Sequence, residues 1–208
     1  MTRTVDAAVF QQMVIHAAAA INAQKQGIND LNVFPVPDGD TGTNMSLTIA
    51  AAAQEMKKKR FDSVGAAAGA CASALLRGAR GNSGVILSLL FRGLAKAIKE
   101  KDTIDGRDLA LALDYGVAAA YKAVMKPAEG TILTVSRMSA ARAAGAARED
   151  NCFQSVLEQA IQEGHAALAQ TINMNPVLKK AGVVDAGGKG FLVILQGMLD
   201  ELNGLPMP

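Results

Sequence analysis

The stretch Asn32-Val33-Phe34-Pro35-Val36-Pro37-Asp38-Gly39-Asp40-Thr41-Gly42-Thr43-Asn44-Met45 separates two helical segments and carries the most distinctive chemistry of the chain. Two carboxylates with one glycine between them can share a hard divalent cation such as Mg²⁺, which prefers oxygen ligands. A helix that begins in the Thr-Gly-Thr-Asn run directs unpaired N–H groups and a partial positive charge at the same loop. The stretch therefore favours a joint metal and phosphate site. The alternative is an ordinary capped turn, since Asp, Thr and Asn are common N-cap residues.

Composition predicts one helical domain. The chain has 208 residues, of which 50% are hydrophobic and only 4% aromatic, so small residues must build much of the core. The net charge of +2 leaves no electrostatic footprint for nucleic acid. The densest basic run, Lys57 to Arg60, is interpreted as a solvated helix C-terminus.

The sequence predicts a cytoplasmic protein. Its two cysteines, Cys71 and Cys152, lie far apart in helical contexts and are expected to be buried free thiols. The N-terminus lacks a signal-peptide pattern, and no apolar run is long enough to span a membrane.

Helical periodicity dominates, and no segment alternates like a strand. Eight helices are expected, with Gly27 ending the first and residues 173–190 forming the last irregular stretch: about 6–26, 43 to the basic run, 63–76, 83–99, 106–124, 132 into the 140s, 153–172 and 191–202. Short connections make neighbours antiparallel, so an all-α, up-and-down bundle or closed barrel is predicted.

That topology places the starts of the second, fourth, sixth and eighth helices at one end. These starts follow the glycine-rich and hydroxyl-rich loops of the chain, namely residues 38–43, 81–84, 129–131 and 185–188. Four such helix starts at one rim would form a concave anion site with preorganised N–H donors.

Other motifs are less informative. The run Asp185 to Gly190 does not meet the P-loop spacing, because glycine follows Lys189 and no strand precedes it. His16 and His165 are interpreted as structural helical histidines. The chain thus offers metal ligands and phosphate donors but no evident general base. This pattern suits phosphoryl transfer to an acceptor that is already ionised, such as a carboxylate.

Four motifs resemble a known family. Residues 32–45, together with Ala79-Arg80-Gly81-Asn82-Ser83-Gly84-Val85-Ile86, Glu129-Gly130-Thr131-Ile132-Leu133 and Val183-Val184-Asp185-Ala186-Gly187-Gly188, are similar in content and order to the catalytic domain of bacterial fatty acid kinases. That domain is related to the nucleotide-binding L subunit of dihydroxyacetone kinases.

The resemblance implies an eight-helix barrel that binds ATP or ADP with two Mg²⁺ ions at one rim. It also implies transfer of the γ-phosphate to the carboxylate of a fatty acid held by a separate fatty-acid-binding protein, which gives an acyl phosphate. Asp38 and Asp40 would act in catalysis and, with Asn32, bind the metal. The nucleotide would be surrounded by Thr41, Gly42, Thr43, Asn44, Gly81, Asn82, Ser83, Gly130, Thr131, Asp185, Gly187 and Gly188.

One position departs from the dihydroxyacetone kinase branch, which uses a third aspartate upstream of the pair. Here Asn32 stands upstream with Asp30 nearby, so the third metal ligand is open between them. Fatty acid kinases resembling this chain are longer, and residues 1–208 are therefore expected to be a single ATP-binding domain from the N-terminal part of a longer protein. The functional alternatives are a dihydroxyacetone kinase-type subunit, a non-catalytic ADP-sensing module and a purely structural bundle.

Overall fold

The computed structural model describes residues 1–208 and is almost entirely helical. Its only strand-like feature is an isolated antiparallel bridge between Val5 and Ile104. The helices are α1 (Ala7–Asp30), α2 (Thr41–Lys58), α3 (Val64–Gly78), α4 (Gly81–Ala97), α5 (Gly106–Ala123), α6 (Ile132–Glu149), α7 (Phe153–Met174), α8 (Pro176–Ala181) and α9 (Ala186–Leu202).

Short polar side chains set most helix starts. Asp6 caps α1 by accepting a hydrogen bond from the N–H of Val9 (2.9 Å), and Ser63 caps α3 through Ala66 (3.0 Å). Asp105 and Asp108 form a reciprocal capping box at the start of α5. These side chains satisfy N–H groups that the first helical turn leaves without partners.

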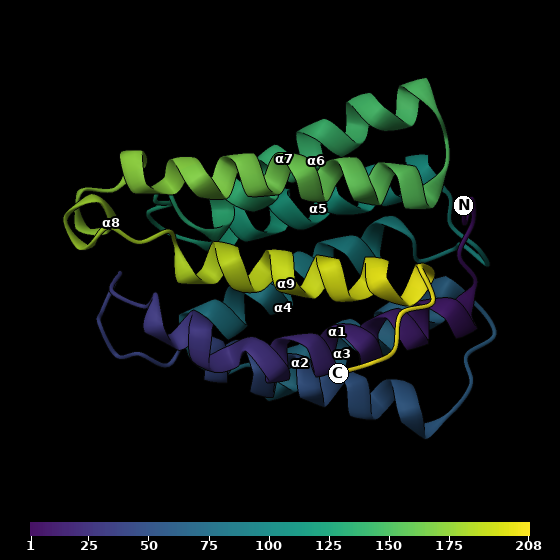
Figure 1. Ribbon diagram of the computed structural model, residues 1–208. Coiled ribbons are helices and arrows are strands. Elements are labelled where there is room, and N and C mark those ends of the chain that lie inside the picture. The colour runs from purple at the N-terminus through teal and green to yellow at the C-terminus, as the bar shows by residue number, and fades with distance from the viewer.

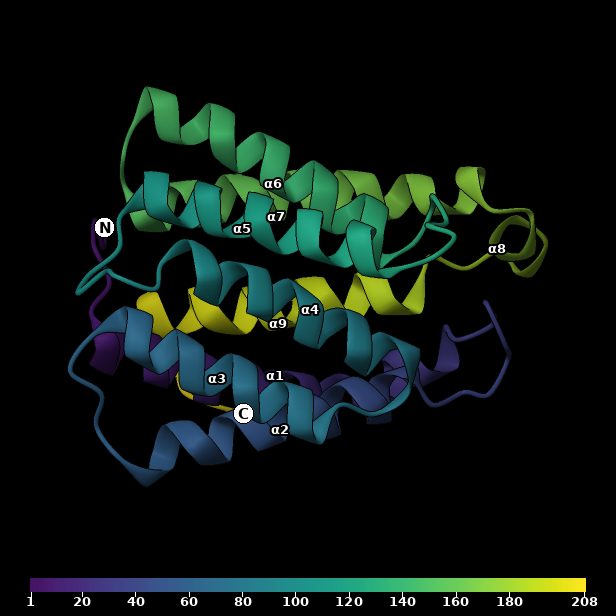
Figure 2. The ribbon, with the colours of Figure 1, turned by 180° about the vertical axis from the view of Figure 1, so that it is seen from behind.

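The eight long helices form a closed ring. Each packs antiparallel against the next along the chain, and α9 packs against both α7 and α1, so the last helix closes the barrel onto the first (Figures 1 and 2). The short α8 lies outside the ring at the end of α7. The predicted all-α, eight-helix up-and-down barrel is therefore confirmed, with α8 as an added short helix.

One apolar core fills this ring. Fifty-two buried residues form a single cluster, and many are alanines, which allow close approach of the helices. Phe91, Phe153 and Phe191 line a residual cavity of about 40 Å³ within the ring. Both cysteines are buried and unpaired, as predicted. No helix combines the length and the apolar character needed to cross a membrane.

Four predicted boundaries were wrong. Gly27 does not end α1, because Ile28 is fully buried and packing of that side chain keeps the helix going to Asp30. Helices α2 and α4 each begin two residues earlier than predicted, at Thr41 and Gly81, so part of each polar loop is helical. The stretch 173–190 is not irregular throughout, since it contains α8 and the first turn of α9.

The starts of α2, α4, α6 and α9 lie at one end of the barrel, at the left in Figure 1 and at the right in Figure 2. This is the arrangement that the alternating order predicts. We call this end the polar rim, made of residues 32–44, 80–84, 129–132 and 185–188.

Helix packing generates a first prediction. At the contact of α4 with α5, a Cβ atom on Gly93 would lie 2.2 Å from the carbonyl oxygen of Tyr115. Gly93→Ala should therefore force the two backbones apart and lower the free energy of unfolding by about 1–3 kcal/mol. Urea unfolding measures this change.

Gly69 in α3 is the matched control, because no atom lies within 4 Å of a Cβ placed there. Gly69→Ala should raise stability by up to about 1 kcal/mol through helix propensity alone. Equal effects of the two substitutions would contradict the packing described here.

Candidate functional site at the polar rim

The loop between α1 and α2 is organised by the buried side chain of Asn32. Its carboxamide oxygen accepts hydrogen bonds from the N–H groups of Asp40 (3.0 Å) and Thr41 (3.2 Å), and its Nδ2 donates to the carbonyl of Val36 (3.1 Å). Asn32 thus satisfies the N–H groups of the N-cap residue and of the first helical residue. The N–H of Thr43, which an N-cap side chain would usually accept, is taken by Asn29 (3.0 Å). Asp40 stands at the N-cap of α2, yet its carboxylate makes no capping hydrogen bond.

The carboxylates of Asp38 and Asp40 have no partner within the protein. Both are exposed, and neither carboxylate has a hydrogen bond or an ion pair in the protein. Gly39 between them has a φ of 67°, a conformation that favours glycine. Two neighbouring negative charges without a protein cation form a donor set suited to a hard divalent ion.

The protein alone offers such an ion an incomplete shell. No group of three His, Cys, Asp or Glu side chains could hold a metal. Mg²⁺ is commonly bound through one or two carboxylates while water and phosphate oxygens complete its octahedron, so two aspartates fit this ion when a phosphate is present.

Both residues considered as a third metal ligand already have hydrogen-bond partners in the protein. The two N–H groups that Asn32 accepts occupy its carboxamide oxygen, and Asp30 accepts a hydrogen bond from Gln26 (2.9 Å). The metal role of Asn32 stays a prediction. The structure adds a role that sequence reasoning missed, namely the positioning of the Asp38–Asp40 loop.

The first turn of α2 is locked against α1. Asn29 and Thr43 bond reciprocally: Asn29 Nδ2 donates to the Thr43 hydroxyl (2.9 Å), and the N–H of Thr43 donates to Asn29 Oδ1 (3.0 Å). A Cβ on Gly42 would lie 2.1 Å from the carbonyl oxygen of Lys25. Helix packing therefore requires the glycine at 42, independently of any ligand. Asn29 was not predicted, because nothing in its local sequence indicates contact with residue 43.

The start of α4 is the most open on the rim. Helix α4 has no side-chain cap, so the N–H groups of its first turn, including Asn82 and Ser83, lack intrahelical partners. A Cβ on Gly81 would lie 2.5 Å from Asn44 Nδ2, which places Gly81 directly against α2. The structure thus brings Asn44, Gly81, Asn82 and Ser83 together, as the sequence predicted.

On the other side of the rim, Asp185 joins α9 to α6. Its buried carboxylate caps α9 by accepting from the N–H of Gly188 (2.8 Å), and its own N–H donates to the Thr171 hydroxyl (3.1 Å). Burial raises the pKa of Asp185 to about 6, while the Gly188 hydrogen bond and a weaker interaction with the N–H of Ile132 act in the opposite direction. Gly187 also lies against Ile132, so the starts of α6 and α9 are in contact.

Thr131 caps α6 by accepting from the N–H of Leu133 (3.3 Å), and its hydroxyl donates to the carbonyl of Ala128 (2.7 Å). A Cβ on Gly190 in α9 would lie 2.5 Å from the sulfur of Met45 in α2. The four helix starts therefore form one continuous row in the order α4, α2, α9, α6. Every residue predicted to bind the metal or nucleotide lies on this row.

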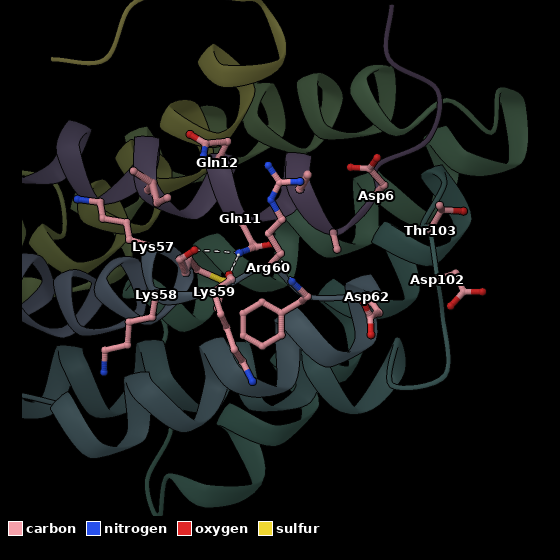
Figure 3. Close-up of a pocket in the computed structure, with 15 residues that line it drawn as sticks. Asp6, Gln11, Gln12, Lys57, Lys58, Lys59, Arg60, Asp62, Asp102 and Thr103 are labelled. Carbon is pink, nitrogen blue, oxygen red and sulfur yellow. Dashed lines mark hydrogen bonds between the residues drawn. The ribbon is translucent and has the colours of Figure 1, made fainter.

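A broad groove lies elsewhere in the protein. A groove of about 890 Å³ is located where α2 ends, between the first turns of α1 and residues 56–62 (Figure 3). Its walls carry both the basic run Lys57 to Arg60 and the carboxylates of Asp6, Asp62 and Asp102. None of the predicted site residues lines it. The candidate site is thus an open rim that does not coincide with this groove.

Comparison with known proteins gives a family match. Residues 35–200 match the sequence model of a family described as "DAK2 domain". Protein YloV of Bacillus subtilis (strain 168) is 45% identical over 206 residues, which cover 99% of this chain and 37% of that protein. The uncharacterized protein SH1689 of Staphylococcus haemolyticus is 45% identical over 205 residues, again 37% of its length. The chain therefore spans little more than a third of these relatives.

Solved structures share the fold. The dihydroxyacetone kinase from C. freundii in complex with AMP-PNP and Mg²⁺ aligns with a TM-score of 0.72 at 17% identity, over 96% of this chain and 35% of that one. The native form of the dihydroxyacetone kinase of C. freundii aligns with a TM-score of 0.65 at 19% identity.

The raised pKa of Asp185 generates the second prediction. Between the ordinary pKa of 3.8 and about 6, the folded protein binds more protons than the unfolded chain, so stability from this group falls as pH rises through that range. The loss should be on the order of 2–3 kcal/mol. Asp185→Asn cannot titrate and should lack it.

Urea unfolding at pH 4, 5, 6 and 7 tests this expectation through the difference between wild type and Asp185→Asn. Other carboxylates titrate in both proteins and cancel in that difference. The free energy of unfolding of the wild type should rise relative to that of Asp185→Asn as the pH is lowered. Parallel curves would show that the buried carboxylate is not held as described.

Proposed function

Because the chain belongs to the DAK2-domain family, we propose that it is a kinase-type module that binds Mg²⁺ and ATP or ADP at the polar rim. The observation that carries this proposal is the union of two unpaired carboxylates, Asp38 and Asp40, with four helix starts in one row. Helix starts attract phosphates through N–H groups and their partial positive charge. The kinase of the same fold was solved with AMP-PNP and Mg²⁺, which supports the same ligands here.

The proposed roles of the rim residues differ with their chemistry. Asp38 and Asp40 would hold the metal and act in catalysis through it. Asn32 would fix their loop and is the predicted further ligand. The open first turn of α4, with Asn82 and Ser83, would bind phosphate oxygens. Thr41 to Asn44, Gly81, Gly130, Thr131, Asp185, Gly187 and Gly188 would surround the rest of the nucleotide. Bound Mg²⁺, expected as two ions, would neutralise charge on the transferred phosphoryl group.

The acceptor is proposed from the roles of the titratable groups. Asp38 and Asp40 are assigned to the metal, the Asp185 carboxylate caps α9, and His16 is buried in α1 among core residues, so no rim side chain is assigned as a base. An acceptor that is already a carboxylate needs no base. We therefore propose transfer of the γ-phosphate to a fatty acid held by a separate fatty-acid-binding protein in the cytoplasm, which yields an acyl phosphate.

The fold shared with dihydroxyacetone kinase supports a second candidate. In that case the acceptor would be a triose hydroxyl, and a partner would have to supply the base. A module that binds ADP without turnover is the third. Since the relatives are much longer, the regions outside these 208 residues would contribute to engaging the acceptor-carrying protein.

A third prediction concerns ligand binding. Ligand at about 100 times its dissociation constant adds about 2.7 kcal/mol of stability. For a domain of this size, Mg²⁺ with ADP or ATP should raise the Tm by roughly 5–10 °C. Asp38→Asn should lose the Mg²⁺-dependent part of the shift.

Asp114→Asn is the control, because Asp114 is an exposed aspartate of α5 outside the rim and should keep the full shift. Absence of any shift in wild type would reject nucleotide binding and leave a structural bundle. A full shift in Asp38→Asn would reject the metal assignment and favour ADP sensing.

A fourth prediction concerns the acceptor. The full-length protein with Mg²⁺, ATP and a fatty-acid-loaded carrier should form acyl phosphate, detected as hydroxamate after hydroxylamine treatment. It should form no triose phosphate from dihydroxyacetone with a matching partner. The reverse result would assign the protein to the triose branch, and tight ADP binding with no turnover would favour the sensing module.

A further inference from the structure

We propose that Glu129 is a positioning residue that holds the Gly130–Thr131 turn in the shape that receives the nucleotide, acting through the Thr134 hydroxyl. The inference rests on the proposed function, because it names how one part of the same rim is kept in place. It goes beyond that function by assigning a role to Glu129 and Thr134, neither of which is among the predicted ligands.

The contact between Glu129 and the turn is indirect. The Thr134 hydroxyl donates its hydrogen to Glu129 Oε2, and the same hydroxyl oxygen accepts the N–H of Gly130 at 2.8 Å. A hydroxyl has one hydrogen and two lone pairs, so giving that hydrogen to a carboxylate leaves a lone pair free for Gly130. Without the carboxylate, the Thr134 hydroxyl could turn to a carbonyl of its own helix, as threonines in helices do.

Thr134 cannot easily be replaced in this role. The residue is 1% exposed, so water cannot substitute for its hydroxyl at the Gly130 N–H. Gly130 itself has a φ of 80° and lies against α7, where a Cβ would be 2.8 Å from Cβ of Met174. The turn is therefore fixed by α7 on one side and by Thr134 on the other.

Two further residues hold the carboxylate of Glu129. The Tyr121 hydroxyl donates to Oε1 (3.3 Å), and Arg137 Nη2 lies 3.4 Å from Oε2. Arg137 Nε also donates to the Tyr121 hydroxyl (3.2 Å), which closes the network across α5, the loop and α6. The Thr134 hydrogen bond first, and then the charge of Arg137, hold the pKa of Glu129 below its usual value. Glu129 is thus kept ionised and oriented.

The turn held in this way leads directly into the rim. Thr131, the next residue, caps α6, and Ile132 follows it at the contact with α9 and Asp185. The N–H of Thr131 has no acceptor among the loop and side-chain hydrogen bonds of the protein. It is available to a phosphate oxygen only while the Gly130–Thr131 turn keeps this conformation.

The test compares dissociation constants for Mg²⁺·ATP, measured by calorimetry, with the Tm of each variant. Glu129→Ala and Thr134→Val should each weaken binding about tenfold, which equals about 1.4 kcal/mol. Because both substitutions break one relay, the double variant should also lose about tenfold and not a hundredfold. Glu129→Gln keeps an acceptor for Thr134 and should restore affinity to within about threefold of wild type.

Asn151→Ala is the matched control at the opposite end of the barrel. Asn151 bonds Asp105 (2.8 Å) and the N–H of Arg107 (2.7 Å), so its loss removes a comparable helix-start network. It should lower the Tm without changing nucleotide affinity. If Glu129 only stabilised the fold, Glu129→Ala would likewise lower the Tm and leave nucleotide affinity unchanged.

The inference is overturned if Glu129→Ala binds nucleotide as wild type does, or if the losses in Glu129→Ala and Thr134→Val multiply in the double variant. Failure of the proposed function has a different signature, since wild type and Asn151→Ala would then bind no nucleotide either.

Discussion

Closure of an antiparallel ring is the constraint on which the rest of the structure depends. Once α9 packs between α7 and α1, the direction of every long helix is set by its place in the order, and four helix starts must share one end. The helix dipoles then add partial positive charge at that rim, about half an elementary charge from each start. The C-terminal ends of α1, α3, α5 and α7 lie at the same rim and carry partial negative charge. The positive charge is therefore confined to the individual helix starts, and the loops decide which of these starts can receive a phosphate.

Asn32 fixes the loop that places two carboxylates at this rim. Its carboxamide accepts the N–H groups of Asp40 and Thr41. Because Asn29 in α1 accepts the N–H of Thr43, the aspartate at the N-cap of α2 keeps its carboxylate free. At the start of α9, by contrast, the Asp185 carboxylate is buried and accepts the capping hydrogen bond itself. Two aspartates on one rim therefore differ in role because one has a neighbour that caps in its place.

The sequence was sufficient for those features that depend on local pattern. Periodicity and caps such as Ser63 and Asp105 predicted eight long helices and the shared rim, and the motif order placed the candidate residues on it. Features set by distant contacts could not be predicted. Burial of Ile28 extends α1 past Gly27, Asn29 pairs with Thr43, and Lys25 requires the glycine at 42, all through packing between α1 and α2. Gly42, predicted to contact the nucleotide, is thus required by the close approach of α1 and α2.

The charges of the rim favour a metal–phosphate complex over either component alone. Asp38 and Asp40 would repel a free nucleotide, and the positive helix starts beside them would repel a free cation. A Mg²⁺–nucleotide complex would satisfy both, because its metal would meet the carboxylates while its phosphate oxygens would meet the open first turn of α4. An aspartate pair that binds such a complex would need no third protein carboxylate. The phosphate that the helix starts retain would itself complete the coordination of the metal.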